Sequence, residues 1–376
     1  MSTSTQERTQ ESGASIAGTE DPILGISEIS NERYQAMLSH IRSSAPPLLQ
    51  KLQAGLSQLP VELIWAAHPH WPLPSSSPPA RQQTVRISVL DSSFNPPTLA
   101  HLALANSKRP RYRNEPDGTD YDAKLLLLSV RNADKTLKPG DASYLQRLEM
   151  MALLGQDVRT SGEGRNVAIA IIDEPTFAGK SRVLQEYLRT RIQQLAAPTE
   201  VSTLSPATVS TQLSFIIGMD TLERVFSPRY YPPPPSDPVN TAESTMRATM
   251  TKMLSPLSEG GDDSLIVCAK RGNLAINPAQ EKEDWRSTLN MVLAQDPGWM
   301  TPLQLHEASR DKGISAEERV VVFDIGDRES KFSSTAVRNA RGRLGVVGTE
   351  SGGGTWRMWV TRNVARYIEE EKLYLL

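Results

Sequence analysis

The stretch RISVLDSSFNPPTLAHLALANS, residues 86–107, joins an apolar run to a polar turn and the start of a helix. The apolar run predicts a buried strand, and the double proline 96–97 suits a first helical turn. His101 follows Thr98 by three residues, so both share one face of that turn. A helix N-terminus favours an anion, to which an imidazole can donate a hydrogen bond. Position alone fits a capping or packing histidine equally well.

Six apolar runs along the chain predict the fold class. They span residues 85–90, 124–130, 166–172, 212–218, 264–269 and 319–325. Continuous runs of Val, Ile and Leu that alternate with helical segments are typical of a parallel sheet buried on both faces. The sequence therefore predicts an α/β protein with a Rossmann-like parallel sheet and helices on both faces. Ligands of such sheets bind beyond the carboxyl ends of the strands.

Composition narrows the class of protein. The 376 residues include 41 basic and 43 acidic side chains, a formal net charge of -2, which argues against a nucleic-acid partner. No apolar stretch reaches about 18 residues, so we expect no membrane span. The single cysteine, Cys268, lies in an apolar run and favours a reducing compartment. The first residues are polar and contain no apolar signal core, so we expect a cytoplasmic or nuclear protein.

Composition also predicts the domain organisation. Residues 1–28 are rich in Ser, Thr, Gln and Glu, which predicts a disordered tail. Residues 29–84 are predicted to form an N-terminal helical extension, with one helix from Asn31, a second after a proline pair, and a Pro/Ser-rich loop. Residues 85–376 form the main domain. Residues 232–263 interrupt its alternation and predict a mobile surface insertion with one short helix.

A second polar motif, KFSSTAVRNARG, occupies residues 331–342. Its Ser-Ser-Thr run predicts a helix start, where hydroxyls and free amides can surround an anion. Arg338 lies one turn into this helix, on the face of Ser334 and Thr335, and its planar guanidinium can pair with a phosphate. Alone, the segment also fits an ordinary helix cap.

Taken together, the two motifs carry a family resemblance. SSFNPPTLAH resembles the Gly-Ser-Phe-Asn-Pro-x-[His/Thr]-x-x-His signature of nucleotidyltransferases, and KFSSTAVR is similar to their Ile-Ser-Ser-Thr-x-x-Arg segment. The nearer likeness is to nicotinamide mononucleotide (NMN) adenylyltransferases, whose eukaryotic members carry threonine at the position of Thr98. The layout looks like the divergent fungal branch. The resemblance implies the nucleotidyltransferase fold for residues 85–376.

The resemblance also implies an ATP site. Its residues would be Ser92, Ser93, Phe94, Asn95, Thr98, His101, Ser333, Ser334, Thr335 and Arg338. His101 would bind an ATP phosphate and stabilise charge in the transition state, and Arg338 would hold the β- and γ-phosphates. Ser92 replaces the leading glycine of the family. A serine side chain there is expected to crowd the approach of the backbone to the phosphates.

An NMN site is implied between the two motifs. Its residues would be Lys135, Lys138, Arg147, Phe177, Gly218, Asp220 and Tyr231. The cations would hold the NMN phosphate, with Lys138 the closer match in spacing, and the two aromatic rings would stack on the pyridinium ring. From the residues alone, aromatic side chains also fit a core, the cations fit a solvated surface, and Asp220 fits a helix cap.

The implied activity is transfer of AMP from ATP to the phosphate of NMN, which gives NAD and pyrophosphate. ATP and NMN would be the partners, Mg²⁺ would ride on the phosphates, and no protein metal ligands are expected. Two alternatives stay open. One is transfer to another phosphate acceptor, or from CTP. The other is a nucleotide-binding protein with weak catalysis that acts in protein interactions or quality control. The sequence leaves the oligomeric state open.

Overall fold

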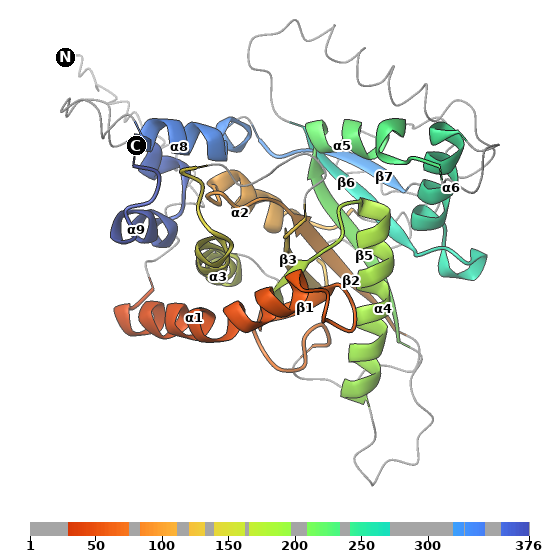
Figure 1. The fold of residues 1–376 in the computed structure, drawn as a ribbon, viewed down its shortest axis with the longest axis horizontal. Helices are drawn as coiled ribbons and strands as arrows, with labels where there is room; N and C mark the ends of the chain where they lie inside the picture. Colours follow the sequence, from red (N-terminus) through yellow and green to blue (C-terminus); the bar gives the residue numbers. More distant parts are fainter. Residues whose placement is uncertain are drawn as a thin grey trace, which may run out of the picture.

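The computed structural model describes residues 29–74, 83–110, 120–131, 139–161, 165–196, 209–233, 241–270, 319–326, 328–342 and 355–375. Within these ranges the strands form one sheet in the order β1-β4-β3-β2-β5-β6-β7 (Figure 1). The strands are β1 (Val61–Ala66), β2 (Gln83–Asp91), β3 (Ala123–Ser129), β4 (Val167–Ile172), β5 (Val209–Gly218), β6 (Ser264–Lys270) and β7 (Val320–Asp324). The six predicted runs are confirmed as β2 to β7.

The strand order is that of a Rossmann-like sheet. Strands β2 to β7 are parallel, and only β1 pairs antiparallel, with β4. From β2 the chain builds outward through β3 and β4 on one side, and through β5, β6 and β7 on the other. The predicted fold class is thereby confirmed. The order reverses at β2, and in open α/β sheets the crevice at such a point receives the ligand. The turn after β2 therefore lies where a ligand is expected.

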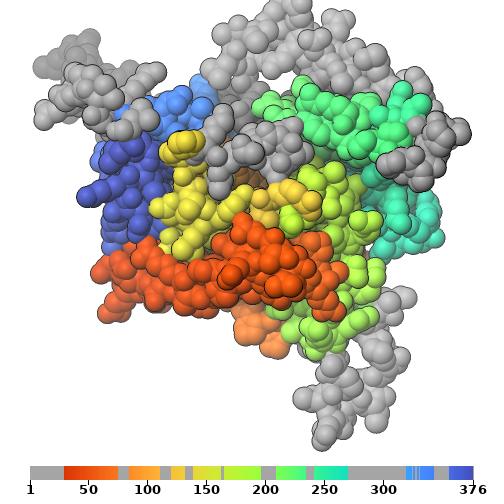
Figure 2. All heavy atoms as spheres, viewed as in Figure 1, coloured from red at the N-terminus to blue at the C-terminus, as the bar shows by residue number. Residues whose placement is uncertain are grey.

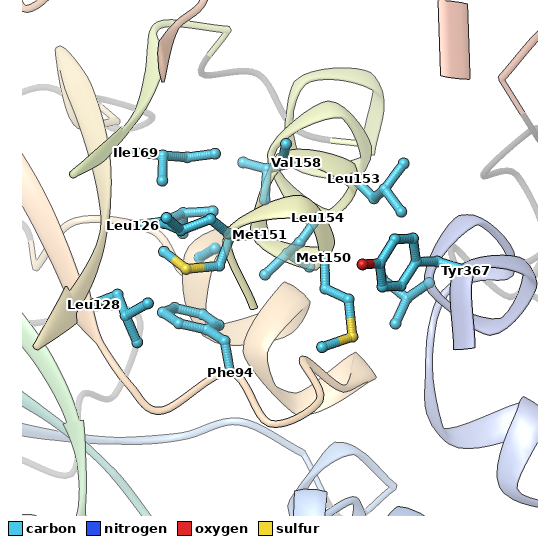
Figure 3. Close-up of a cluster of buried hydrophobic side chains, with 14 of the residues drawn as sticks. Phe94, Leu126, Leu128, Met150, Met151, Leu153, Leu154, Val158, Ile169 and Tyr367 are labelled. Atoms are coloured by element: carbon cyan, nitrogen blue, oxygen red, sulfur yellow. The ribbon is translucent and has the colours of Figure 1, made fainter. Parts of the chain in front are cut away.

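Helices cover both faces of the sheet. They are α1 (Asn31–Gln53), α2 (Leu99–Ala105), α3 (Tyr144–Ser161), α4 (Phe177–Ala196), α5 (Met219–Val225), α6 (Ala242–Leu254), α8 (Ser334–Gly342) and α9 (Arg362–Glu370). Successive side chains of a strand point to opposite faces. On β3, Leu126 and Leu128 enter the core shared with α1, α3 and α9, whereas Leu125 and Leu127 enter the core shared with α4 and α6. Figure 3 shows the first core, where Leu126, Leu128 and Ile169 lie beside side chains of α3.

The N-terminal extension differs from the prediction of two helices. One continuous helix, α1, runs through Pro46 and Pro47. Each internal proline costs about 3 kcal/mol. The helix also buries seven side chains in the first core, where it contacts α3 and β1; among them are Tyr34, Ile41 and Leu49. Each large apolar side chain among them stabilises the fold by about 1.5–3 kcal/mol. The burial exceeds the proline cost, so the helix continues.

Strand β1 was absent from the sequence-based prediction. It pairs with β4 from Val61 opposite Ile172 to Ala66 opposite Ala168, so part of the extension belongs to the same sheet as the main domain. Only Val61 and Ile64 of the strand are buried. The apolar stretch of this edge strand, residues 63–66, is short, and burial within the strand does not alternate every second residue, so pairing with β4 supplies its order.

The predicted surface insertion contains a helix that is part of the core. Helix α6 buries Met246, Met250, Met253 and Leu254. These side chains join the second core, with α4 and the short helix η1 (Pro228–Tyr230) as neighbours. Their spacing places them on one face, which explains why the helix packs against the sheet instead of projecting from it. Residues 234–240 and the predicted tail, 1–28, lie outside the described residues.

Helices far apart in the sequence close one side of the molecule. In Figures 1 and 2, α1 and the segment containing α9 lie side by side. The Tyr34 hydroxyl donates to Glu370 over 3.0 Å, and Arg42 bonds to both Glu149 and Glu371. Glu149 is 2% exposed and also accepts from Tyr367, so its buried carboxylate has a cation and a hydroxyl as partners.

The single cysteine lies in the core of the sheet. Cys268 is a buried free cysteine in β6, where burial raises the pKa of its thiol to about 12. It therefore packs as a small core residue. No helix in the described part of the chain has the length and apolar character needed to cross a membrane.

Candidate functional site

The turn after β2 is anchored by a buried aromatic ring. Phe94 has a φ of 43°, in the left-handed region that is uncommon for a bulky side chain. Its ring is fully buried in the first core and lies 5.3 Å, centroid to centroid, from the ring of His101. Phe94 therefore shapes the turn by packing its ring into the core under the turn. The unusual backbone at this position is held by burial of the ring.

His101 is held through both ring nitrogens. Its Nδ1 accepts the backbone N–H of Thr98 over 3.0 Å and lies 2.9 Å from the Thr98 hydroxyl. A nitrogen that accepts an N–H carries no proton, so in the neutral ring the proton is on Nε2. Nε2 lies 2.9 Å from the hydroxyl oxygen of Ser92 and donates to it. The residue is thus both a helix cap and an oriented donor, which unites the two interpretations of its position.

Asn95 is the centre of a buried hydrogen-bond network. The residue is 4% exposed. Its Nδ2 donates to Asp141 over 2.7 Å, and its Oδ1 accepts the N–H of Ala142 over 3.2 Å and the hydroxyl of Tyr374 over 2.9 Å. These partners come from the loop before α3 and from the segment after α9. Asn95 therefore joins three separate parts of the chain.

The second motif lies directly against the first. The Ser334 hydroxyl donates to the carbonyl of Pro96 over 2.7 Å, across 238 positions of sequence. Arg338 donates to the carbonyl of Asn95, and its Nε lies 3.8 Å from Asp141. Ser333 directly precedes α8 and caps it, since its hydroxyl accepts the N–H of Ala336 over 3.1 Å. The structure thus brings both predicted phosphate motifs to the carboxyl end of β2.

Two further members of the predicted ATP site are Ser92 and Thr335. The backbone N–H of Ser92 donates to the carbonyl of Leu127 over 3.3 Å, which fastens the turn to β3. Thr335 is exposed, and its hydroxyl accepts from Arg338 over 3.3 Å. The hydroxyl of an exposed side chain beside a guanidinium is available to a phosphate.

Arg147 occupies a different place from the one predicted for a ligand of the NMN phosphate. Its side chain is 8% exposed. It donates to the carbonyl of Ala142 over 2.9 Å and to that of Ser93 over 3.4 Å, and it lies 3.7 Å from Asp141. Burial lowers its pKa. The guanidinium supports the turn after β2 from within, because these backbone carbonyls and Asp141 surround it.

Three of the residues predicted for the NMN site lie at strand ends. Gly218 ends β5, and apart from its chain neighbours no atom of the described residues lies within 4 Å of the position that a Cβ would take there. Asp220 is exposed in the first turn of α5. Phe177 starts α4, with its ring 5.6 Å from that of Phe215 and 4.8 Å from Nζ of Lys180. Lys180 itself is buried and paired with Asp91, at the end of β2.

Tyr231 is a core residue, which differs from its predicted stacking role. It is 6% exposed, and its hydroxyl donates to the carbonyl of Val225 over 2.6 Å. Burial of this hydroxyl raises its pKa. Its ring packs in the second core, where α6 covers it. Lys135 and Lys138 lie outside the described residues.

Sequence reasoning missed two residues of this site, Asp141 and Tyr374. Asp141 precedes α3 and reaches Asn95, Arg147 and Arg338. The position of Asp141 before a helix indicates a helix cap, but it does not indicate contacts with these three residues. Tyr374 gives no signal in the sequence, since it follows α9 and meets Asn95 only through the tertiary fold.

Carboxylates near the site are already paired with cations. Asp91 pairs with Lys180, and Asp141 lies close to Arg147 and Arg338. The described residues contain no group of three His, Cys, Asp or Glu side chains that could hold a metal ion. What they do present at the end of β2 is an oriented imidazole, an arginine and several hydroxyls, which is a chemistry suited to phosphates.

Comparison with known proteins supplies one informative relative. No protein-family model matches the chain. A Schizosaccharomyces pombe protein described as "Putative nicotinamide mononucleotide adenylyltransferase" is 32% identical over 145 residues. The resemblance inferred from the motifs is confirmed. The match spans 39% of this chain and 44% of that relative, so the chain matches less than half of the relative's length.

Two solved structures show a partial likeness to the chain. Two structures of Plasmodium falciparum nicotinic acid mononucleotide adenylyltransferase, complexed with NaAD and with APC, are each 12% identical to this chain. Each match spans 77% of this chain, and the two matches span 97% and 96% of the solved chains. The TM-scores are 0.37 and 0.36. Because these TM-scores are low, the fold is described from the strand order of this chain alone.

Proposed function

We propose that this protein transfers the adenylyl group of ATP to the phosphate of a pyridine mononucleotide, with NMN as the favoured acceptor. The observation that carries the proposal is the contact between Arg338 and Asn95, together with that between Ser334 and Pro96. Two motifs that resemble the phosphate motifs of one enzyme family meet at the carboxyl end of β2, where such sheets bind ligands. The named S. pombe relative supports the same reaction class.

The reaction needs no covalent intermediate on the protein. An oxygen of the acceptor phosphate attacks the α-phosphorus of ATP, the bond from that phosphorus to the bridging oxygen breaks, and pyrophosphate leaves. The protein's task is to position both substrates and to stabilise negative charge on the phosphate oxygens. His101 would supply the N–H of Nε2, Arg338 its guanidinium, and Ser333, Ser334 and Thr335 their hydroxyls and amides.

Mg²⁺ would enter with the substrate. It binds polyphosphate oxygens and keeps several waters, so it needs few protein ligands. Asp91 and Asp141, the carboxylates closest to the motifs, are engaged with cations. We therefore assign no step to a residue that ligates the ion.

The test is a product assay on purified protein. ATP and Mg²⁺ are incubated with NMN, and separately with nicotinic acid mononucleotide, and both dinucleotide and pyrophosphate are quantified. We expect equal amounts of dinucleotide and pyrophosphate, with a higher kcat/KM for NMN. CTP in place of ATP is the control for the nucleotide. If neither acceptor gives a dinucleotide while ATP still binds, the proposed reaction is wrong.

A second candidate function is nucleotide binding with weak catalysis. The contact between Ser92 and Nε2 of His101 favours this alternative, because the hydroxyl of Ser92 engages the imidazole proton. The family that the motifs resemble has glycine at the position of Ser92. Under this alternative, calorimetry would show ATP binding at micromolar concentration, and turnover would stay near background with every acceptor.

A further inference from the structure

We propose that Tyr374 is a positioning residue for the transfer reaction, because its hydroxyl holds Asn95 and thereby keeps the turn after β2 in place against α8. This inference rests on the proposed function and adds a residue that the motifs do not contain. Tyr374 lies 279 positions from Asn95 in the sequence, and its hydroxyl donates to Asn95 Oδ1 over 2.9 Å.

The backbone after α9 is shaped to deliver this side chain. Lys372 and Tyr374 have φ values of 51° and 59°, both in the left-handed region. Such a conformation costs about 1–3 kcal/mol for a residue other than glycine, and it persists where the surroundings hold it. Here the N–H of Leu373 donates to the carbonyl of Ile368 over 3.0 Å, and Leu373 and Tyr374 are 8% and 7% exposed. The segment therefore packs as a defined turn.

The hydroxyl of Tyr374 supplies one of the two hydrogen bonds that hold the Oδ1 of Asn95. Oδ1 accepts two donors, Tyr374 and the N–H of Ala142, while Nδ2 donates to Asp141. A reversed amide would place its N–H groups against the N–H of Ala142 and its oxygen against the carboxylate of Asp141, so the observed orientation is strongly favoured. In that orientation the Tyr374 hydroxyl can act only as a donor to Oδ1. Without the hydroxyl, Oδ1 keeps one donor, and the amide is less firmly held.

Asn95 passes this restraint on to the second motif. Its backbone carbonyl accepts from Arg338, and the next carbonyl, that of Pro96, accepts from Ser334. The same residue is thus fixed at its side chain by Tyr374 and at its backbone by Arg338. Loss of the tyrosine hydroxyl should allow the turn and α8 to shift relative to each other, and phosphate binding needs groups from both.

The charge around the hydroxyl fits a permanent donor. Asp141, Arg147 and Arg338 all lie close enough to influence it electrostatically, and burial raises the pKa of Tyr374. The phenol therefore stays protonated across the physiological range and can always donate to Asn95. Its contribution is expected to be constant with pH.

The experiment compares Tyr374→Phe with Tyr34→Phe in the full chain. Both tyrosines are buried, and Tyr34 donates to Glu370 over 3.0 Å without contacting Asn95. For Tyr374→Phe we expect kcat/KM for ATP to fall, and the ATP Kd from calorimetry to rise, by roughly five- to tenfold, the effect of one lost hydrogen bond. Both variants should lower the Tm by a similar amount. Tyr34→Phe should leave kcat/KM and Kd for ATP unchanged.

A double-mutant cycle tests the route through Asn95. In an Asn95→Ala background, Tyr374→Phe should weaken ATP binding no further, because its partner is already gone. The calorimetric arm is independent of turnover, so it separates a failure of this inference from a failure of the proposed reaction. Wild-type ATP affinity in Tyr374→Phe, additive losses in the cycle, or loss of the cooperative thermal transition would each overturn the inference.

Discussion

Nε2 of His101 lies 2.9 Å from the hydroxyl oxygen of Ser92 and donates its proton there, since Nδ1 accepts the N–H of Thr98. The donor that the proposed reaction would direct at a phosphate is therefore engaged by a side chain of the same turn. For His101 to reach a phosphate, this bond must be exchanged, or the serine hydroxyl must donate its own proton to the phosphate in its place.

The first prediction concerns Ser92. Ser92→Gly removes both the competing acceptor and the side chain that crowds the turn, so we expect kcat/KM for ATP to rise by about three- to tenfold, the range of one hydrogen bond. Ser92→Ala is the matched variant, because it removes the acceptor and keeps the Cβ. An increase in both variants identifies the hydrogen bond as the cause, and an increase in Ser92→Gly alone identifies the crowding. A loss of turnover in both would show that the hydroxyl itself serves the phosphate.

The second prediction concerns His101. His101→Ala should lower kcat by about two orders of magnitude, as does removal of one oriented donor to a developing charge. Because the ring also caps α2, the variant should lose about 1 kcal/mol of stability. Thr241→Ala is the control, since Thr241 caps α6 through Ser244. It should show a comparable change in Tm with normal turnover. A normal kcat in His101→Ala would show that the histidine serves only as a cap of α2.

The third prediction concerns Arg338. Its guanidinium meets the Asn95 carbonyl and can present a second edge to a phosphate, a geometry that a lysine ammonium cannot reproduce. We expect Arg338→Ala and Arg338→Lys to raise the calorimetric Kd for ATP by similar factors, on the order of tenfold or more, while NMN binding is unchanged. Arg341→Ala is the control on the same helix, where the side chain lies over Trp356 at 5.4 Å. Rescue by lysine would contradict a bidentate role.

The fourth prediction concerns Asp157 and pH. Its carboxyl is 1% exposed and accepts from Asn363 over 2.7 Å, and burial raises its pKa to about 6. The unfolded value is about 4, so the native state binds the proton more tightly, and stability from this group is full below pH 4 and is lost as pH rises through 6.

Asp157→Asn removes this loss and keeps the acceptor for Asn363. The difference in the free energy of unfolding between the variant and the wild type should therefore be small at pH 4 and favour the variant at pH 8, by up to about 3 kcal/mol. Thermal melts of both proteins between pH 4 and 8 measure it. A difference that is flat with pH would show that the carboxylate is stabilised in its charged form.

Local sequence was sufficient for much of the fold. The runs that became β2 to β7 are rich in Val, Ile and Leu, and such strands can be placed without knowledge of their neighbours. The two motifs predicted to bind phosphate could also be recognised, because each is one short continuous stretch of sequence. Short-range spacing is preserved in any fold that contains the element.

Other features depend on partners distant in the chain. Strand β1 is ordered by pairing with β4, and α1 continues through its prolines because α3 buries one face of it. Helix α6 joins the core by its methionines, and Tyr231 packs there as well. In each case the local pattern fits two structures, and burial against another element selects between them.

The same division holds within the site. The residue types for phosphate chemistry, His101 and Arg338 among them, are legible in the sequence, since imidazole, guanidinium and hydroxyl groups carry that chemistry wherever they lie. The pairing of Asn95 with Tyr374, the engagement of His101 by Ser92 and the inward turn of Arg147 arose only in the folded chain. A hydrogen bond requires two groups within about 3 Å, and only folding brings these pairs, which are 5 to 279 positions apart, to that distance.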